Sequence, residues 1–185
     1  MDKHPGYVKR MGELTLDAFK TEYGLDWSCV RLANTFGPGD NFDPDNAMFI
    51  PSLMAKIDRG DDPVVVWGDG SPVRDFIYSE DAARGILHAL YYGTDGFVNI
   101  SSGNGFSVRH VVETLRDIVP FNYVFDATLS RGHERRVMSI TKAKEQIHWQ
   151  PEVSLEDGLR RTWEWFRHNR QEYLKRQNYF AGCAG

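Results

Sequence analysis

The residue best suited to chemistry in this sequence is Arg74, which follows the glycine-rich turn Gly68-Asp69-Gly70 and opens a predicted strand. A planar guanidinium makes paired, charge-assisted hydrogen bonds to phosphate oxygens, and glycines keep bulky side chains away from the approach. The pattern predicts a contact to a phosphate or diphosphate. The alternative is a structural ion pair between Arg74 and Asp75 or Asp81.

Two further polar residues are candidates for the same kind of site. Asn34 follows the predicted strand 27–32, at the strand end where ligands bind in open α/β sheets, and its amide can donate to and accept from a sugar hydroxyl. The alternative is a turn residue that caps backbone groups. Arg136 offers a second cationic contact, although an exposed charge cluster explains it equally well.

Helices and strands are expected to alternate along the chain, which is typical of an α/β fold. Apolar periodicity predicts a buried helix over 8–23 ended by Gly24, and Ser107 and Ser154 are predicted helix caps. Short apolar runs predict the strands, of which 64–67 and 73–78 are expected to pair across the glycine turn. The predicted helices lie at 8–23, 49–57, 79–91, 108–118, from 141 and after 154, and the strands at 27–32, 64–67, 73–78, 97–100 and 123–125.

These elements predict the C-terminal part of a Rossmann-type parallel sheet plus a small mixed α/β substrate-binding lobe. Residues 1–40 are expected to carry the last helix and strand of the Rossmann-like part. Residues 41–180 are expected to form mainly the substrate-binding lobe, with a strand near 97–100 returning to the Rossmann-like sheet. A loose tail is expected at 181–185.

Composition excludes several classes of function. The net charge of −4, with both signs interspersed, gives no basic stripe for nucleic acid. Because no apolar run approaches the ~20 residues of a membrane helix and the first residues have no signal-peptide core, we expect no membrane association. The two cysteines have no metal spacing, which favours a cytoplasmic protein without a metal site.

Two segments, 31–42 and 65–78, resemble the extended short-chain dehydrogenase/reductase family of NAD-dependent nucleotide-sugar epimerases, dehydratases and reductases. The first reads Arg-Leu-Ala-Asn-Thr-Phe-Gly-Pro and is similar to the family's Arg-Pro-x-Asn-x-Tyr-Gly-Pro. The resemblance implies a nucleotide sugar as substrate and NAD or NADP as cofactor. It implies substrate contacts at Asn34, Asn46, Ile50, Val65, Arg74 and Arg136, and cofactor contacts at Lys9, Leu32 and Asn34.

The catalytic pair that the resemblance implies is incomplete here. Lys9-Arg10-Met11-Gly12-Glu13 is similar to the segment that begins at the family's catalytic lysine, but Pro5 stands where the catalytic tyrosine would be. Tyr7 is the nearby phenol, and it lies roughly 200° around a helix from Lys9. Lys9 and Tyr7 are therefore the catalytic candidates, with a purely structural Lys9 as the alternative.

The family resemblance is greatest to members that reduce and epimerise a GDP-4-keto-6-deoxy sugar, in which a histidine before an Ile-Pro pair acts as an acid. Met48 occupies that position here and cannot transfer a proton. No glycine-rich dinucleotide loop follows a strand and opens a helix in this sequence. The expected cofactor would therefore be held with an N-terminal half that this sequence does not supply.

Two hypotheses follow for function. The chain is the substrate-binding half of an NAD(P)-dependent nucleotide-sugar epimerase, dehydratase or reductase, inactive when isolated and completed by an N-terminal-half partner chain or a homo-oligomer. The alternative is a catalytically incomplete fragment that binds a nucleotide sugar and regulates a partner subunit.

Overall fold

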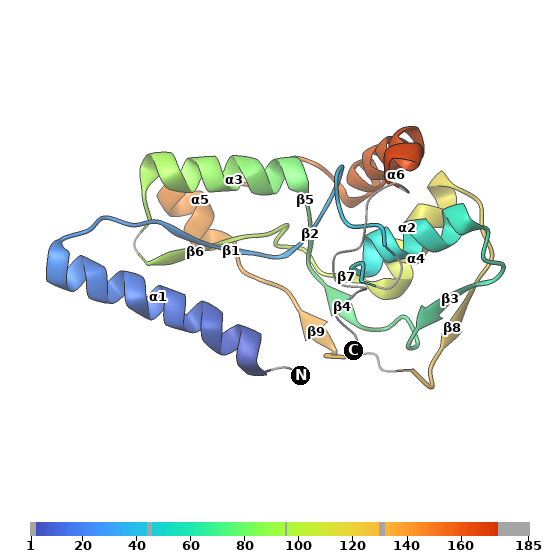
Figure 1. The fold of residues 1–185 in the computed structure, drawn as a ribbon, viewed down its shortest axis with the longest axis horizontal. Coiled ribbons are helices and arrows are strands. Elements are labelled where there is room, and N and C mark those ends of the chain that lie inside the picture. Colours follow the sequence, from blue (N-terminus) through green and yellow to red (C-terminus); the bar gives the residue numbers. More distant parts are fainter. Residues whose placement is uncertain (1–2, 44–45, 95, 130–131, 174–185) are drawn as a thin grey trace.

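Two pairs of parallel strands, each covered by helices, organise the computed structural model, which describes residues 3–43, 46–94, 96–129 and 132–173 (Figure 1). In the first pair, β1 (Cys29–Leu32) runs parallel to β6 (Phe97–Ile100). On one side of these strands lie α3 (Ser79–Tyr92) and α5 (Thr141–Ile147), and on the other lies α1 (Lys3–Tyr23) (Figure 1). A helix layer on each side of parallel strands is the α/β arrangement predicted from the sequence.

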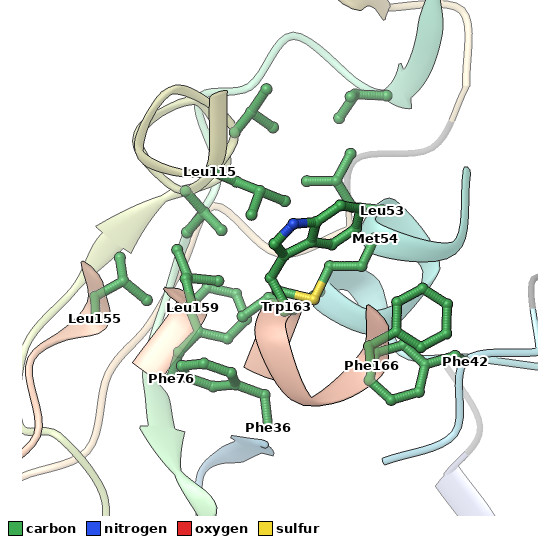
Figure 2. Packing of buried hydrophobic residues seen from close by; sticks show 14 of the residues in the cluster. Phe36, Phe42, Leu53, Met54, Phe76, Leu115, Leu155, Leu159, Trp163 and Phe166 are labelled. Atoms are coloured by element: carbon green, nitrogen blue, oxygen red, sulfur yellow. The ribbon is translucent and has the colours of Figure 1, made fainter. Parts of the chain in front are cut away.

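The second pair consists of β3 (Val64–Trp67) and β8 (Tyr123–Asp126), which are also parallel. Three helices pack around this pair: α2 (Phe49–Arg59), α4 (Val108–Ile118) and α6 (Leu155–Tyr173). Their shared core is shown in Figure 2, where apolar side chains of α2 and α6 lie beside the rings of Phe36, Phe42 and Phe76. The rings of Phe42 and Phe166 stack with their centroids 4.2 Å apart.

Short strands join the two pairs. β2 (Asn34–Phe36) runs parallel to β5 (Phe76–Tyr78), and β4 (Val73–Arg74) lies between β7 (Phe106–Ser107) and β9 (Arg135–Arg136). β4 is antiparallel to β7 and parallel to β9. Because β4 and β5 follow one another with a single residue between them, both sets of pairings meet at Asp75.

Local chemistry explains most element boundaries. The Ser107 side chain accepts a hydrogen bond from the His110 amide at the start of α4, and Ser154 accepts one from the Asp157 amide at the start of α6, as predicted. Gly60, with a φ of 87°, ends α2 in the left-handed conformation that glycine adopts without strain.

The predicted pairing of segments 64–67 and 73–78 is wrong. Gly68 and Gly70, with φ of 84° and 79°, turn the chain after β3, and the carbonyls of Gly70 and Pro72 accept hydrogen bonds from amides at the start of α4. These bonds carry β4 away from β3 to the side of β7. β3 pairs instead with β8, a strand that lies far away in the sequence.

The prediction of a buried first helix is also wrong, because α1 is largely exposed. Six of its large apolar residues keep 45–72% of their surface open to solvent, among them Tyr7, Val8, Met11 and Leu14. Among the described residues, no element covers the apolar side of α1.

Two further findings concern only the described residues. None of their helices is long and apolar enough to cross a membrane. Within the same ranges, no three histidine, cysteine, aspartate or glutamate side chains cluster as metal ligands would. The tail predicted at 181–185 lies outside the described residues.

Candidate functional site

A cleft of about 490 Å³ lies between α2 and β3. One wall is a face of α2, whose lining residues recur at helical spacing: Phe49, Ser52, Leu53 and Lys56. The opposite wall is β3, and the remaining residues come from β2, β4, β5, the start of α4 and the two positions before α2. The cleft is lined by Asn34, Ala47, Met48, Phe49, Ser52, Leu53, Lys56, Val65, Val66, Trp67, Arg74, Phe76 and Val108.

Asn34 is fixed in this cleft by its neighbour across the β2–β5 pair. Its side-chain Nδ2 donates to the Asp75 carbonyl at 2.8 Å, and its backbone N–H donates to the same oxygen at 3.2 Å. The amide oxygen Oδ1 is left to accept a hydrogen bond from a ligand, because among the described residues no donor is bonded to it. The Asn34 side chain thus caps a backbone carbonyl, as its alternative role predicted, and also lines the cleft.

The Asp75 carboxylate anchors the strand junction on which Arg74 and Asn34 both depend. It is 2% exposed and accepts hydrogen bonds from the Ser102 amide at 2.9 Å, the Ser102 hydroxyl at 2.6 Å and the Met138 amide at 3.2 Å. These donors come from the segments that follow β6 and β9. Asp75 is therefore committed to the framework and does not pair with Arg74.

Asp81, the second acid that could have neutralised Arg74, is also engaged elsewhere. It is buried, forms an ion pair with Arg84, and accepts hydrogen bonds from the backbone amides of Glu152 and Val153. The structural alternative for Arg74, an ion pair with Asp75 or Asp81, is therefore not formed.

Arg74 lies directly beside a second arginine. In the parallel β4–β9 pair, Arg74 is the register partner of Arg136, so the two side chains leave the same face of the ladder. Partial burial and the neighbouring charge of Arg136 both lower the pKa of Arg74 from its usual value. Two guanidinium groups on adjacent strands repel one another, and an anion bound between them would relieve that repulsion.

The two facing walls of the cleft carry a cation, Lys56 of α2, and an aromatic ring, Trp67 of β3. The Lys56 ammonium donates to the Val65 carbonyl at 3.0 Å, which ties α2 to β3 at this point. Trp67 lies two residues further along β3, on the same face as Val65, and is 63% exposed. A flat apolar ring with this exposure can stack on a planar ligand group.

The cleft thus brings together three residues predicted from the sequence: Asn34, Val65 and Arg74. Arg136 is adjacent to Arg74 and exposed. Ile50 is 1% exposed and belongs to the core, and Asn46 lies in an exposed turn where it bonds Asp43.

Apart from Asn34, which was predicted for both substrate and cofactor contact, the residues predicted for catalysis and cofactor contact lie elsewhere. Lys9 and Tyr7 are exposed on α1, and Leu32 is at the exposed end of β1. None of these three lines the cleft.

Sequence reasoning missed Lys56 and Trp67 as site residues. The signal for Lys56 was its helical spacing from Phe49 and Leu53, and the signal for Trp67 was its alternation with Val65 along a strand. Both patterns are also those of ordinary surface residues, so neither marks a ligand site until α2 and β3 are placed face to face.

The chemistry of the cleft follows from its lining. Among the lining residues, the side chains that carry charge are Lys56 and Arg74, and both are cations. The other side chains are mainly apolar or aromatic. Such a site suits an elongated ligand with an anionic part and a flat part.

A comparison with known protein families agrees with this arrangement. Residues 6–101, more than half of the chain, match the NAD dependent epimerase/dehydratase family. The chain belongs to this family. The matched region contains the cleft except for Val108.

Individual relatives in the epimerase/dehydratase family match nearly the whole chain. It is 36% identical over 170 residues to GDP-L-fucose synthase 1 of Arabidopsis thaliana, a match that covers 88% of this chain and 52% of the relative. It is 30% identical over 182 residues to GDP-L-fucose synthase of Escherichia coli K12, covering 90% and 56%. The chain therefore spans about half the length of the curated relatives it matches.

Solved structures support the same family fold. The UDP-glucose 4-epimerase of Thermotoga maritima, determined with UDP-glucose, superposes with a TM-score of 0.81 at 34% identity, over 89% of this chain and 53% of the epimerase. A GDP-L-fucose synthetase from Naegleria fowleri gives a TM-score of 0.79 at 28% identity, over 89% and 54%. The fold class predicted from the sequence is confirmed.

The described residues lack one element of a Rossmann-type dinucleotide site. The sequence has no glycine-rich loop between a strand and a helix, which is the element that receives a dinucleotide pyrophosphate in Rossmann-type folds. The cofactor that the family uses therefore does not fit the described residues alone, and no hydride transfer can be assigned to them.

Proposed function

We propose that the cleft between α2 and β3 binds a nucleotide sugar. The observation that carries this proposal is the juxtaposition of Arg74 and Arg136 in register on β4 and β9, beside a cleft whose charged lining groups are cations. A diphosphate would accept charge-assisted hydrogen bonds from both guanidinium groups. It would also offset the two effects that lower the pKa of Arg74, which are its partial burial and the neighbouring charge of Arg136.

The rest of the cleft suits the two ends of such a molecule. Trp67 offers a flat, exposed ring on which a nucleobase can stack. Asn34 offers an amide oxygen to a sugar hydroxyl while its Nδ2 stays bonded to the Asp75 carbonyl. The diphosphate at Arg74 would connect these two contacts.

In this proposal the chain is the substrate-binding half of an NAD(P)-dependent nucleotide-sugar epimerase, dehydratase or reductase. The names of the matched GDP-L-fucose synthases favour a GDP-sugar, for which we propose the GDP-4-keto-6-deoxy type, while the T. maritima epimerase was determined with UDP-glucose. NAD or NADP would supply hydride chemistry from a complementary half. This chain would bind the diphosphate, orient the sugar and exclude water with its apolar wall.

A second candidate function is binding without catalysis, as a regulatory fragment. The observation that favours it is the lining of the cleft, in which no described residue is a carboxylate, histidine, tyrosine or cysteine that could exchange a proton with a sugar. Met48, which lines the cleft, is also unable to transfer a proton. The proposed catalytic candidates Lys9 and Tyr7 lie on α1, outside it.

Isothermal titration calorimetry with GDP-, UDP- and dTDP-sugars tests the proposed binding site. We expect at least one nucleotide sugar to bind the full chain, and Arg74→Ala to weaken that binding tenfold or more. Arg160→Ala is the matched control, because Arg160 is an exposed arginine on α6 paired with Glu156. Absence of binding by all three donor classes, or equal affinity in Arg74→Ala and the wild type, would falsify the proposal.

The two candidate functions differ in turnover. Incubation of the chain with the sugar that binds, NAD(P) and a complementary half should yield product if the chain is part of an enzyme. Binding that is intact without any turnover under these conditions would favour the regulatory fragment.

A further inference from the structure

The last residue of α6 is fastened to the segment that follows β2. The Tyr173 hydroxyl donates a hydrogen bond to the Asp40 carbonyl at 2.5 Å and accepts one from the Phe42 amide at 2.8 Å. The Phe42 ring, which is 3% exposed, meets the Tyr173 ring edge-on, with 5.2 Å between the ring centroids. One hydroxyl therefore ties down two backbone groups that lie 133 and 131 residues away in the sequence.

The segment that Tyr173 holds carries an unfavourable group. The Asp40 carboxylate accepts a hydrogen bond from the Asn41 amide through Oδ1 at 2.7 Å, but its Oδ2 is buried and has no hydrogen-bond partner among the described residues. This burial raises the pKa of Asp40 above its usual value. Because a buried charged oxygen without a donor costs free energy, the segment is held in place against a local cost. The two hydrogen bonds to Tyr173 contribute to holding it.

The same segment leads directly to the wall of the cleft. The Asp43 carbonyl accepts hydrogen bonds from the amides of Asn46 and Ala47. Ala47 and Met48 line the cleft immediately before α2 begins. A displacement of Phe42 would therefore be carried within a few residues to the rim of the cleft.

The other end of α2 is also held by α6. Asp58, in the last turn of α2, is paired with Arg170 at 2.5 Å and with Arg167 at 3.7 Å. The C-terminal part of α6 thus fixes α2 at one end through Asp58 and fixes the approach to its other end through Tyr173. The face of α2 that lines the cleft lies between these two attachments.

We propose that Tyr173 is a positioning residue for the nucleotide-sugar cleft, which acts through Phe42 on the wall that Ala47 and Met48 share with α2. Its hydroxyl keeps this wall in one arrangement, so a ligand does not have to order the wall when it binds. This role rests on the proposed nucleotide-sugar binding. It places a determinant of affinity at the end of α6, beyond the residues 6–101 that match the family. The alternative is a purely structural contact, which would change the stability of the fold but not the affinity of the folded chain for its ligand.

Calorimetric titration of Tyr173→Phe, with the nucleotide sugar that binds the wild type, tests this role. The substitution removes the hydroxyl and keeps the ring, so the two backbone groups lose their partner while the packing on Phe42 remains. We expect the affinity to fall about fivefold or more, because the binding-competent arrangement becomes a smaller fraction of the population. Hydrogen exchange of the Ala47 amide should be faster in the unliganded variant than in the wild type, and saturating ligand should abolish this difference.

Two matched variants separate positioning from stability, with all affinities measured at a temperature at which every variant is folded. Tyr123→Phe removes a phenol hydroxyl from β8, where it bonds Glu113, and should bind the ligand within twofold of the wild type. Asp40→Asn keeps both backbone contacts to Tyr173 and should also bind within twofold.

The outcomes distinguish this inference from the proposed function. Equal affinity in Tyr173→Phe and the wild type, with binding intact, would overturn the role of Tyr173 and leave the proposed function standing. An equal loss of affinity in Asp40→Asn and Tyr173→Phe would also overturn it, because the carboxylate would then be the group that matters. Absence of binding by the wild type would overturn the proposed function and this role together.

Discussion

The Arg31 guanidinium binds the Glu13 carboxylate through two hydrogen bonds, from Nε to Oε1 at 2.7 Å and from Nη2 to Oε2 at 2.6 Å. The same guanidinium lies over the ring of Phe97, with Cζ 3.2 Å from the ring centroid. One arginine of β1 therefore links α1 to β6. Among the described residues, the side-chain hydrogen bonds between α1 and another element are the two that Arg31 donates to Glu13.

Loss of the Glu13–Arg31 pair should release α1 from the sheet in a pH-dependent way. Hydrogen bonding to Arg31 lowers the pKa of Glu13 from 4.5 to about 2. Because the folded pKa is depressed, the pair contributes its full stability above about pH 4.5 and loses it as the pH falls towards 2. Arg31 is partly exposed, so we expect only about 1–2 kcal/mol.

Urea unfolding of the wild type and Glu13→Gln between pH 2 and 7, followed by helical circular dichroism, measures this contribution. The stability difference should be largest near neutral pH and should shrink below pH 4.5. A difference that stays constant across the range would mean that the carboxylate charge is not responsible.

Two helical glycines should respond in opposite ways to alanine. A Cβ on Gly85 of α3 would lie 2.7 Å from Ile100 Cγ2, whereas a Cβ on Gly12 of α1 would meet no atom within 4 Å. We expect Gly85→Ala to destabilise the fold by about 1–3 kcal/mol through overpacking. Gly12→Ala should instead favour α1 by up to about 1 kcal/mol, because alanine has the higher helix propensity.

Thermal unfolding of both variants tests this pair, with helix content as a second readout for Gly12→Ala. If Gly85→Ala were as stable as the wild type, α3 would not approach β6 as closely as the structure indicates.

The carboxylate of Asp75 should be essential to the strand junction that holds Arg74 and Asn34. An asparagine in its place keeps the shape but directs an NH₂ group at donors from Ser102 or Met138. A buried donor without its acceptor costs about 1–3 kcal/mol, more where a charged partner is lost. We expect Asp75→Asn to lose about 2–4 kcal/mol and Ser102→Ala about 1 kcal/mol, in chemical denaturation. Equal losses in the two variants would show that the charge of Asp75 is unimportant.

Trp67 should report directly on ligand binding. Its ring is exposed and lines the proposed nucleobase end of the cleft, so a bound base should quench its fluorescence. Stacking of a base on an aromatic ring is worth about 1–3 kcal/mol, so Trp67→Ala should weaken binding by roughly 5- to 150-fold. Trp165→Phe is the control, because Trp165 packs against the core. Quenching that survives in Trp67→Ala but disappears in Trp165→Phe would place the base elsewhere.

The sequence alone determined the local elements and part of the candidate site. Helix boundaries followed from single residues such as Ser107 and Gly24, because capping and left-handed turns depend on neighbours in the chain. Asn34 and Arg74 were predicted because each stands at a strand boundary within a recognisable segment. The structure places both in one cleft.

Tertiary structure decided the strand partners and the rest of the cleft. Segment 64–67 pairs with β8 because bonds from the glycine turn to the start of α4 direct β4 elsewhere, and such long-range contacts leave no mark in local periodicity. Lys56 and Trp67 join the cleft only when α2 faces β3. The apolar periodicity of α1 showed that the helix has a surface to bury, but periodicity does not specify the partner. Only the three-dimensional arrangement showed that this surface faces away from the rest of the chain.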